Sequence, residues 1–315
     1  MSQVGHGDAQ EDNTGLWYIN LYPGGRRRND APFNLCRSNG IIAIGWSKLN
    51  PHTRTRSAEK YRMAGRRNFQ KIYDTGKKGL EKWQRAFDIL NGMKEGDLVW
   101  TRRSRGHFFL TRITGSEAIP LYDNEYQIYD FGSGRSCEWI EVIDELEVPA
   151  EVKRNTRGTL HHVRDPKGKA RALSEMLYNE KITEVYHLRE LKGDLFDFLS
   201  PVDVEDLVGL YLQSKKNLLI VPSTSKQSTP LVEFWMISRE SGVEAGVQVK
   251  TGNQKVNLGE YRDPMKYYFF QETGKPKGIR GSNHVFITKE ELDEFARHNP
   301  DLLPAGIRRL VERLT

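Results

Sequence analysis

The sequence predicts two domains, an α+β domain followed by an α/β domain. Its 315 residues are enough for two hydrophobic cores. In the first half, short aromatic or alternating runs are separated by turns about every ten residues, with helical stretches inserted, which is typical of a small β-barrel. In the last third, a helix, a strand, a hairpin, further strands and a helix follow one another, which is an α/β order. We expect a tail at 1–14, domains at 15–165 and 196–315, and a helical connection at 166–195.

The composition is that of a soluble globular protein, because 29% of the residues are charged and 37% are hydrophobic. No apolar run approaches the length that spans a membrane, and residues 1–14 lack the apolar core of a signal peptide. Cys36 and Cys137 match no metal-ligand spacing and cannot form a disulfide framework, which indicates a reducing cytoplasm. No Gly-x-x-x-x-Gly-Lys-Ser/Thr loop occurs, so we expect no requirement for a nucleoside triphosphate.

The net charge of +6 is unevenly distributed and favours the first third of the chain. Residues 54–71 hold seven Lys or Arg against one Glu, and aromatic residues are interleaved with them. Such a patch suits a polyanion, because neutralised phosphates release counterions; the alternative is an ordinary solvated face. The abundance of Arg favours nucleic acid, because guanidinium groups contact phosphates and guanine bidentately. The residues are Arg26, Arg27, Arg28, Arg54, Arg56, Lys60, Arg62, Arg66, Arg67, Lys71, Arg102, Arg103 and Arg105, with Tyr61, Phe69 and Tyr73 among them.

The first domain is expected to combine short strands with two helices. The clearer helix runs from 80 to 93, with Leu80, Trp83, Phe87 and Leu90 on one face at helical spacing. The second helix is expected at 57–73, and the strands at 16–21, 40–46, 96–100, 107–114, 126–130 and 136–142.

Several motifs of this domain resemble the EVE-type domain of the PUA superfamily. They are Trp17-Tyr-Ile-Asn20, Ile42-Ala-Ile-Gly-Trp46, Met93-Lys-Glu-Gly-Asp-Leu-Val-Trp-Thr-Arg102, Phe109-Leu-Thr-Arg-Ile-Thr-Gly115, and Cys137-Glu-Trp-Ile-Glu-Val142 with Val148-Pro149. The resemblance covers about 150 residues. It implies a reader of modified bases that takes an extruded nucleotide into an aromatic pocket, where an apolar slot holds the base faces.

Three tryptophans are candidates for the walls of this base pocket. Trp46 and Trp100 each end a predicted strand, where a barrel mouth forms, and Trp17 is the third choice. Arg102 is placed to contact a phosphate or a base edge. The alternative for each tryptophan is a place in the core. The adjacent pair His161-His162 points in two directions on a strand, so we assign it to structure or surface rather than to a metal.

The connection is expected to hold two helices, at 169–179 and 186–199. The second domain then begins with a helix at 200–212, which Ser200 caps and Pro201 starts. A buried strand is expected at 218–222, followed by a polar stretch at 223–229. Later elements are strands at 267–270 and 284–287 and helices at 288–298 and 304–314, the first of these helices starting with a capping box at Thr288.

A hairpin at 231–252 carries the candidate catalytic residues. If the turn is centred on Ser241-Gly242, the register places Glu233 opposite Lys250. Gln248 lies two residues before Lys250, so both side chains share one face of the strand. A carboxylate, an amide oxygen and an ammonium group then converge on one patch. The alternative is an ordinary surface hairpin with a cross-strand ion pair.

The element order, together with Glu205 on the first helix, Glu233, and Gln248-Val-Lys250, is similar to the PD-(D/E)xK restriction-endonuclease-like superfamily. The Gln-x-Lys form resembles its Mrr-like and modification-dependent branches. The resemblance implies Mg²⁺ (or Mn²⁺) held by Glu233, the amide oxygen of Gln248 and the carbonyl of Val249. Lys250 would orient the attacking water and stabilise negative charge, and Glu205 would reach the metal through water. The sequence departs from the pattern in having Glu as the first acid and Gln in place of the second.

Together these features predict a modification-dependent, type IV-like DNA endonuclease of the cytoplasm, which would serve in phage defence. Its partner is expected to be double-stranded DNA with a modified base such as a modified cytosine, and no membrane is expected to take part. A double-strand cutter of this kind would act as a homodimer. Two alternatives remain open: a nucleic-acid-binding protein whose nuclease-like domain has no catalytic activity, and a nuclease directed at RNA.

Overall fold

The computed structural model describes residues 15–22, 29–53, 55–103, 106–142, 145–154, 156, 158–165, 168–182, 185–188, 191, 193–224 and 231–314. The expected tail at 1–14, the cluster Arg26–Arg28, Arg54, Arg105 and most of the polar stretch at 223–229 lie outside these residues. The chain divides into two compact units, Met1–Leu188 and Arg189–Thr315. The expected connection at 166–195 is therefore not a separate segment, since most of it belongs to the first unit.

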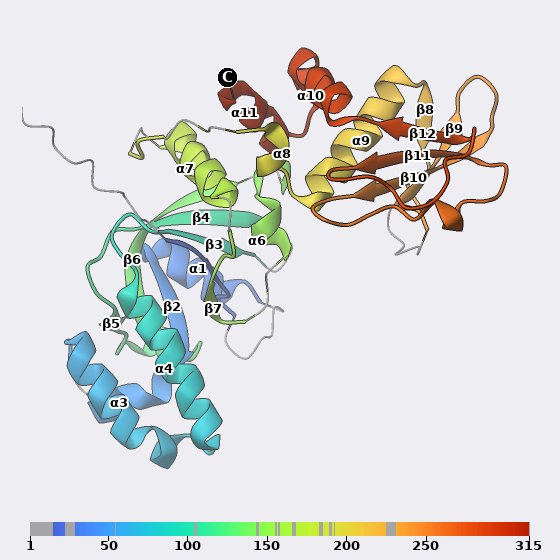
Figure 1. Ribbon diagram of the computed structural model, residues 1–315. Helices are drawn as coiled ribbons and strands as arrows, with labels where there is room; N and C mark the ends of the chain where they lie inside the picture. The colour runs from blue at the N-terminus through green and yellow to red at the C-terminus, as the bar shows by residue number, and fades with distance from the viewer. Residues whose placement is uncertain are drawn as a thin grey trace, which may run out of the picture. The chain divides into compact units, whose positions relative to one another are not determined.

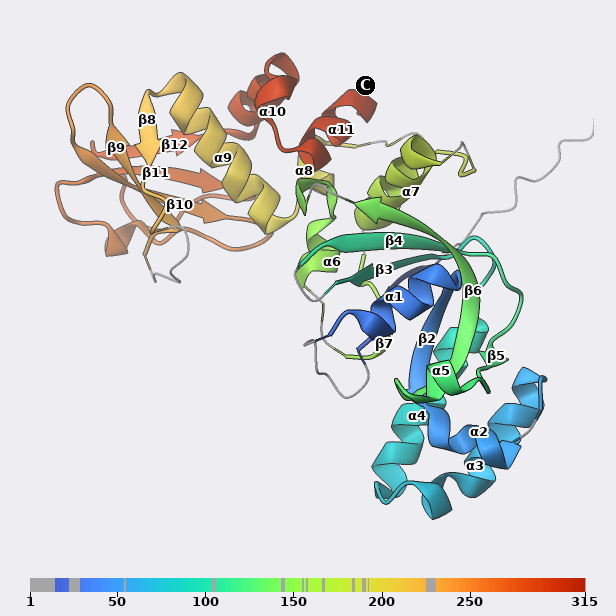
Figure 2. The same ribbon diagram turned by 180° about the vertical axis from the view of Figure 1, so that it is seen from behind.

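The first unit is built on a curled, seven-stranded sheet of order β2-β6-β4-β3-β1-β7, with β5 paired to β6. The long strand β6 makes the curl, because it pairs with β2 through residues 131–136 and with β4 through residues 137–142. Figure 1 and Figure 2 show the resulting half-barrel. The strands are β1 (Leu16–Ile19), β2 (Ile41–Trp46), β3 (Leu98–Arg102), β4 (Phe108–Ile113), β5 (Ile119–Pro120), β6 (Phe131–Val142) and β7 (Leu160–His162).

Both predicted helices of this unit are present, with shifted ends. The expected strand at 126–130 is wrong: Tyr126 lies in helix α5, and Asp130 has a φ of 58°. The apparent alternation did not mark a buried face, because Ile128 is 75% exposed. The helices are α1 (Ala31–Ser38), α2 (Asn50–Thr53), α3 (Ala58–Ile72), α4 (Gly76–Gly92), α5 (Asn124–Gln127), α6 (Ala150–Arg154) and α7 (Lys169–Lys181).

The curled sheet has a hydrophobic core on each face, because its central strands are buried on both sides. Val99 and Phe109 belong to the core that α3 and α4 help to form. Leu98 and Leu110 belong to a second core, to which α6 and α7 contribute. Strands buried on both faces read as continuous apolar runs rather than alternating ones.

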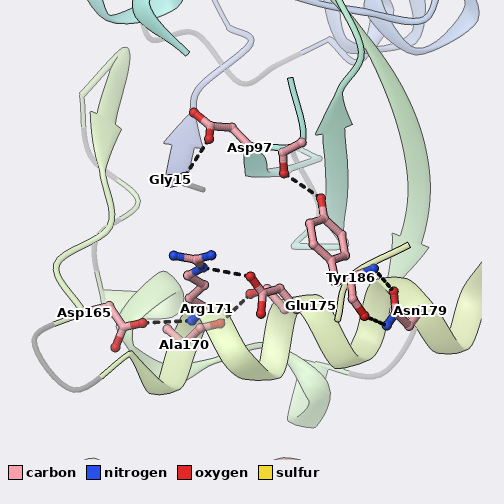
Figure 3. Close-up of polar contacts among 10 residues, drawn as sticks. Gly15, Asp97, Asp165, Ala170, Arg171, Glu175, Asn179 and Tyr186 are labelled. Atoms are coloured by element: carbon pink, nitrogen blue, oxygen red, sulfur yellow. Dashed lines mark hydrogen bonds and ion pairs between the residues drawn. The ribbon is translucent and has the colours of Figure 1, made fainter. Parts of the chain in front are cut away.

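Polar contacts fasten α7 and the segment after it to the first unit. Tyr186 Oη donates to the carbonyl of Gly96 over 2.7 Å, and the amide N–H of Arg171 donates to Asp165 over 2.8 Å (Figure 3). Arg171 and Glu175 form an ion pair one helical turn apart, at 2.8 Å. The helix expected as a bridge between domains is therefore part of the first unit.

The second unit has a mixed five-stranded sheet of order β12-β11-β10-β9-β8. Strands β8, β9 and β10 are antiparallel, whereas β10, β11 and β12 are parallel. Its strands are β8 (Leu218–Ile220), β9 (Phe234–Ser238), β10 (Glu244–Lys250), β11 (Lys266–Gln271) and β12 (His284–Ile287). Its helices are α8 (Leu195–Phe198), α9 (Pro201–Lys215), α10 (Lys289–His298) and α11 (Ala305–Arg313).

The predicted order of elements is found in this unit, and its predicted helix starts are confirmed. Ser200 caps α9 and Thr288 caps α10, each in a capping box. The helix expected at 186–199 is shorter, since the described residues form only α8 there.

The hairpin of β9 and β10 has a different register from the predicted one. Val247 pairs with Phe234 and Glu244 with Ile237, whereas the predicted pairing of Glu233 with Lys250 would have set Phe234 against Val249. The loop spans residues 239–242 and is closed by a bond from Ser238 N to Val243 O, with Gly242 at its end at a φ of 68°. Sequence alone placed the Gly at the centre of the turn. The error moves the pairing by two residues and so leaves Gln248 and Lys250 on the same face.

Candidate functional site

Three of the four predicted catalytic side chains meet at the start of β9 and the end of β10. Gln248 Nε2 donates to Glu233 Oε1 over 3.3 Å, and Lys250 Nζ lies 3.7 Å from the same oxygen. The side chains of Lys250 and Glu233 are 26% and 32% exposed, whereas Gln248 is 2% exposed. In this cluster Gln248 is therefore buried, whereas Glu233 and Lys250 are partly open to solvent.

The backbone at Glu233 is irregular. Its N–H donates to the carbonyl of Val247 over 2.8 Å, although Val247 is the register partner of the neighbouring Phe234. Two consecutive residues thus face one residue of the partner strand, which is the arrangement of a β-bulge. Bulges re-aim side chains at sheet edges and active sites, and here the bulge accompanies a Glu233 side chain directed at Gln248 and Lys250.

The amide oxygen of Gln248 is buried and accepts no hydrogen bond from any residue that the structure describes. A buried acceptor without a donor costs about 1–3 kcal/mol, so it calls for a specific explanation. A bound cation or a water molecule would satisfy this oxygen. This oxygen is the strongest indication of a ligand-binding site in the described part of the second unit.

The cluster lies on the aromatic face of the sheet. A Cβ on Gly246 would approach the Tyr267 ring to 2.7 Å and Val232 to 2.9 Å, so this face leaves no room for a larger residue. Gln248 and Lys250 follow at two-residue steps on the same face. Around them, the core formed by Val232, Tyr261, Tyr267 and Phe269 with neighbouring side chains excludes water and strengthens electrostatic interactions.

The other two predicted residues lie differently. Helix α9, which carries the half-buried Glu205, packs on the opposite face of the sheet, where a Cβ on Gly209 would lie 3.6 Å from the Phe234 ring. Val249 is 5% exposed, and alternation directs its side chain to that helical face. Only its backbone carbonyl is therefore a candidate ligand. The roles of Glu205 and Val249 stay predictions.

The donor set fits a hard cation that keeps most of its water. Glu233 offers a carboxylate and Gln248 an unpartnered amide oxygen, which are the oxygen ligands that Mg²⁺ prefers. Within the described part of the chain, no group of three or more His, Cys, Asp or Glu could hold a metal ion. Glu233 and the neutral Gln248 would together bring one negative charge to a cation held here.

In the first unit, the expectation that Trp100 forms a pocket wall is wrong. Its ring is fully buried, and its indole N–H donates to Ser174 Oγ over 2.9 Å. Strand β3 is covered on both faces, so the end of this strand is not a barrel mouth. Arg102, which follows, is half-buried, and its Nε is enclosed without a partner.

Trp46 ends β2 in a strained conformation. It has a φ of 71°, in the left-handed region that large side chains rarely adopt. Asp130, also left-handed, accepts hydrogen bonds from Ser47 N at 3.0 Å and Ser47 Oγ at 2.9 Å. Strain of this kind persists only where the surroundings enforce it and is concentrated at functional sites. Trp46 was a candidate from the sequence, whereas Asp130 was not, because no motif marks it.

Trp17, the third candidate, lines an open cavity of about 580 Å³ together with residues of α4. Its indole N–H donates to Asp97 over 2.8 Å, and its ring meets His162 edge-on at 4.9 Å. Asp97 also accepts from the N–H of Gly15 (Figure 3). His161 packs beside Tyr18, so both histidines contact aromatic rings, in agreement with the structural role expected for them.

Comparison with known proteins identifies no family. No family model and no curated protein matches the chain. Among solved structures, the chain is similar to the YTH domain of the Zygosaccharomyces rouxii MRB1 protein, determined in complex with N6-methyladenosine RNA. The match has a TM-score of 0.27 and 11% identity, and it covers 58% of this chain and 91% of that one. No helix among the described residues is both long and apolar enough to cross a membrane.

Proposed function

We propose that this protein is a metal-dependent DNA endonuclease that acts on modified DNA. The second unit would hydrolyse the phosphodiester bond, and the first would recognise the modified base. The observation that carries the proposal is the buried amide oxygen of Gln248, which has no donor and belongs to a side chain bonded to Glu233. An ordinary surface hairpin has no reason to bury an unsatisfied oxygen.

The roles follow from the chemistry of each group. Glu233 and Gln248 would hold Mg²⁺, with the carbonyl of Val249 as a further candidate ligand. Bound Mg²⁺ would polarise a phosphoryl oxygen and lower the pKa of a water molecule. Lys250, which is 26% exposed beside Glu233, would orient the incoming water and stabilise the negative charge that develops on phosphorus-bound oxygens. Hydrolysis joins the water oxygen to phosphorus and releases one ester oxygen as a hydroxyl.

Recognition of the modified base is assigned to Trp46. The proposal is supported by its half-buried side chain at a strand end and by the left-handed backbone at both Trp46 and Asp130. An indole offers a flat apolar surface to the faces of an extruded base, and a carboxylate such as that of Asp130 accepts from an exocyclic amino group. Cytosine and adenine carry such a group.

Cutting of paired DNA substrates tests the proposal. Two duplexes of one sequence, with and without modified cytosines, are incubated with the protein and Mg²⁺. We expect faster cleavage of the modified duplex by the wild type and none by Lys250→Ala. Equal cleavage of both duplexes would contradict the reading role, and undiminished cleavage by the variant would contradict the site.

A binding protein without catalysis is the second candidate, and one observation favours it. Among the described residues, Glu233 is the carboxylate that contacts both Gln248 and Lys250, and it already has an ammonium partner in Lys250. Such a pair is also what a structural hairpin would contain. Calorimetric titration with Mg²⁺ and Mn²⁺ separates the candidates: heat that disappears in Glu233→Gln supports the enzyme, and no heat in the wild type supports the binding protein.

An RNA target is distinguished by competition. Labelled duplex DNA bound to the protein is challenged with unlabelled RNA and DNA of the same sequence at one salt concentration, since affinities at different salt are not comparable. Stronger displacement by RNA would assign the protein to RNA instead of DNA.

A further inference from the structure

Nearly all of the net charge of the protein resides on one helical hairpin. Residues 58–92, which span α3, α4 and the turn between them, hold nine Lys or Arg and four Asp or Glu. Their net charge is +5, and that of the whole chain is +6. We call residues 58–92 the basic hairpin. Figure 1 and Figure 2 show it as a pair of helices near the end of β2, and α4 also contacts β2, β6 and β7 of the sheet.

Most of these cations are exposed and make no ion pair. Arg62 binds Asp88, with an Nη2–Oδ2 distance of 3.0 Å, and Lys77 lies 3.9 Å from Glu81. The other seven side chains are exposed and form no ion pair with any residue that the structure describes. They are Lys60, Arg66, Arg67, Lys71, Lys78, Lys82 and Arg85.

The aromatic residues of the basic hairpin point the other way. Tyr61, Phe69, Trp83 and Phe87 are all 0% exposed and pack on one another between the helices. Their centroids lie 5.4–5.9 Å apart in these pairs. Cations and aromatics that are interleaved in the sequence are thus separated in space. These aromatics form the core of the hairpin.

This separation decides what the basic hairpin can bind. Proteins that hold single strands combine cations with exposed aromatic rings on which bases stack. The basic hairpin presents cations, whereas four of its five rings are fully buried and the fifth, Tyr73, is half-buried against Phe69, so the hairpin is suited to phosphates and not to bases. Duplex DNA carries one charge per about 1.7 Å of axis. Helix α3, with 15 residues, is about 22 Å long and matches on the order of a dozen phosphates.

We propose that the basic hairpin binds the phosphate backbone of double-stranded DNA and does so independently of sequence and base modification. This inference rests on the proposed function only in taking DNA as the partner. Lys60, Arg67 and Lys71 recur at helical spacing along one exposed stripe of α3 and form its contact line. The hairpin supplies affinity and orientation, and recognition of the modified base occurs elsewhere in the first unit.

The salt dependence of binding tests the inference. The triple variant Lys60→Gln, Arg67→Gln, Lys71→Gln is compared with the wild type on one duplex and on its single strand. Each lost duplex contact lowers the slope of log K against log salt by about 0.9, so we expect a decrease of two to three in magnitude. The decrease should be the same for modified and unmodified duplexes. Gln is a good helix former, and circular dichroism checks that α3 persists.

A second triple variant, Lys94→Gln, Lys153→Gln, Lys181→Gln, removes the same charge from exposed lysines of the first unit outside the hairpin. It should leave the slope nearly unchanged. An unchanged slope in the hairpin variant, or an equal decrease in both variants, would overturn the inference. So would a stronger effect on the single strand.

The failure of this inference differs from the failure of the proposed function. If the hairpin variant binds DNA like the wild type while Lys250→Ala loses cleavage, the proposed role of the basic hairpin is contradicted and the endonuclease proposal is supported. If the slope of log K against log salt decreases as expected but the wild type cuts no DNA with Mg²⁺, the role of the basic hairpin is supported and the endonuclease proposal is contradicted. A wild type that binds no DNA contradicts both.

Discussion

Gln248 donates its amide N–H to Glu233 and keeps its amide oxygen without a donor, although the residue is 2% exposed. The two side chains are thus oriented by each other before any ligand arrives. A ligand oxygen that is held in place need not be reorganised on binding, which favours a cation over a protein donor at this point.

Gln248→Glu tests whether this position is a metal ligand. In the metal-free protein, a second carboxylate beside Glu233 in a nearly buried position should lower the free energy of unfolding by about 1–3 kcal/mol at neutral pH. Mg²⁺ should restore it, since a ligand at a hundred times its Kd stabilises by about 2.7 kcal/mol. Thermal unfolding with and without Mg²⁺ measures both effects. The exposed Gln254→Glu is the control, and an equal response to Mg²⁺ in both variants would refute the ligand role.

Trp46 and Trp100 should respond to substitution in opposite ways. Trp100→Ala opens a cavity in a full core and should cost about 3–5 kcal/mol of unfolding free energy. Trp46→Gly should be more stable than Trp46→Ala by about 1 kcal/mol, because glycine accepts the left-handed backbone at a φ of 71°. Both Trp46 variants should lose the preference for modified DNA. Urea unfolding and competition binding measure these effects, and a preserved preference would exclude Trp46 from the pocket.

Arg135 is predicted to be a structural residue with a large effect on stability. It is 1% exposed and donates to the carbonyls of Leu90, Asn91, Gly115 and Ser116, tying the end of α4 to the sheet. Arg135→Met leaves these acceptors without the donor and should cost about 3 kcal/mol or more in urea unfolding. Arg135→Lys should also lower the free energy of unfolding, because one ammonium group cannot make all the hydrogen bonds of the planar guanidinium group. A loss no greater than that of the exposed Arg37→Met would contradict this role.

Asp194 gives the second unit a small acid sensitivity. Burial opposes its charge, but the N–H of Phe196 at 2.8 Å and the Lys289 ammonium at 3.1 Å outweigh burial, and the pKa of Asp194 is lowered. A carboxyl group with a lowered pKa stabilises above its unfolded value and loses that stabilisation as the pH falls. Asp194→Asn keeps the helix cap, so it should cost at most about 1 kcal/mol at pH 7 for this half-exposed pair.

That difference between Asp194→Asn and the wild type should begin to decrease as the pH falls through about 4 and should disappear below the lowered pKa of Asp194. Denaturant unfolding at pH 7 and in that acid range measures it. A difference that is constant over the range would show that the charge of Asp194 does not stabilise the unit.

The face of the hairpin could be predicted from the sequence, whereas its register could not. Alternation alone places Gln248 and Lys250 on one side of β10, and this holds for any even shift of the pairing. The register depends on the loop, and Ser241-Gly242 is compatible with a tight turn as well as with the longer loop observed at 239–242. Only the hydrogen bond from Ser238 N to the carbonyl of Val243 distinguishes the longer loop from the tight turn.

The candidate pocket tryptophans show a second limit of prediction from the sequence. A strand-end Trp lies in a pocket or in a core according to what covers it, and the cover is distant in sequence. Trp100 is covered by α7, with Ser174 as its partner, 74 residues away. Trp46 has a left-handed backbone, and the next residue, Ser47, is held by Asp130, which the sequence pattern placed in a strand. The helices α3 and α4, by contrast, were predictable because their apolar spacing is local.

The most direct test of the central claim is single-turnover cleavage of modified duplex DNA in Mg²⁺ by the wild type and by Lys250→Ala. The exposed Lys266→Ala on the neighbouring strand β11 is the control. The account predicts that Lys250→Ala binds the DNA with unchanged affinity and cuts it at least about a hundredfold more slowly, while Lys266→Ala cuts at the wild-type rate. Equal rates for the wild type and Lys250→Ala would contradict it.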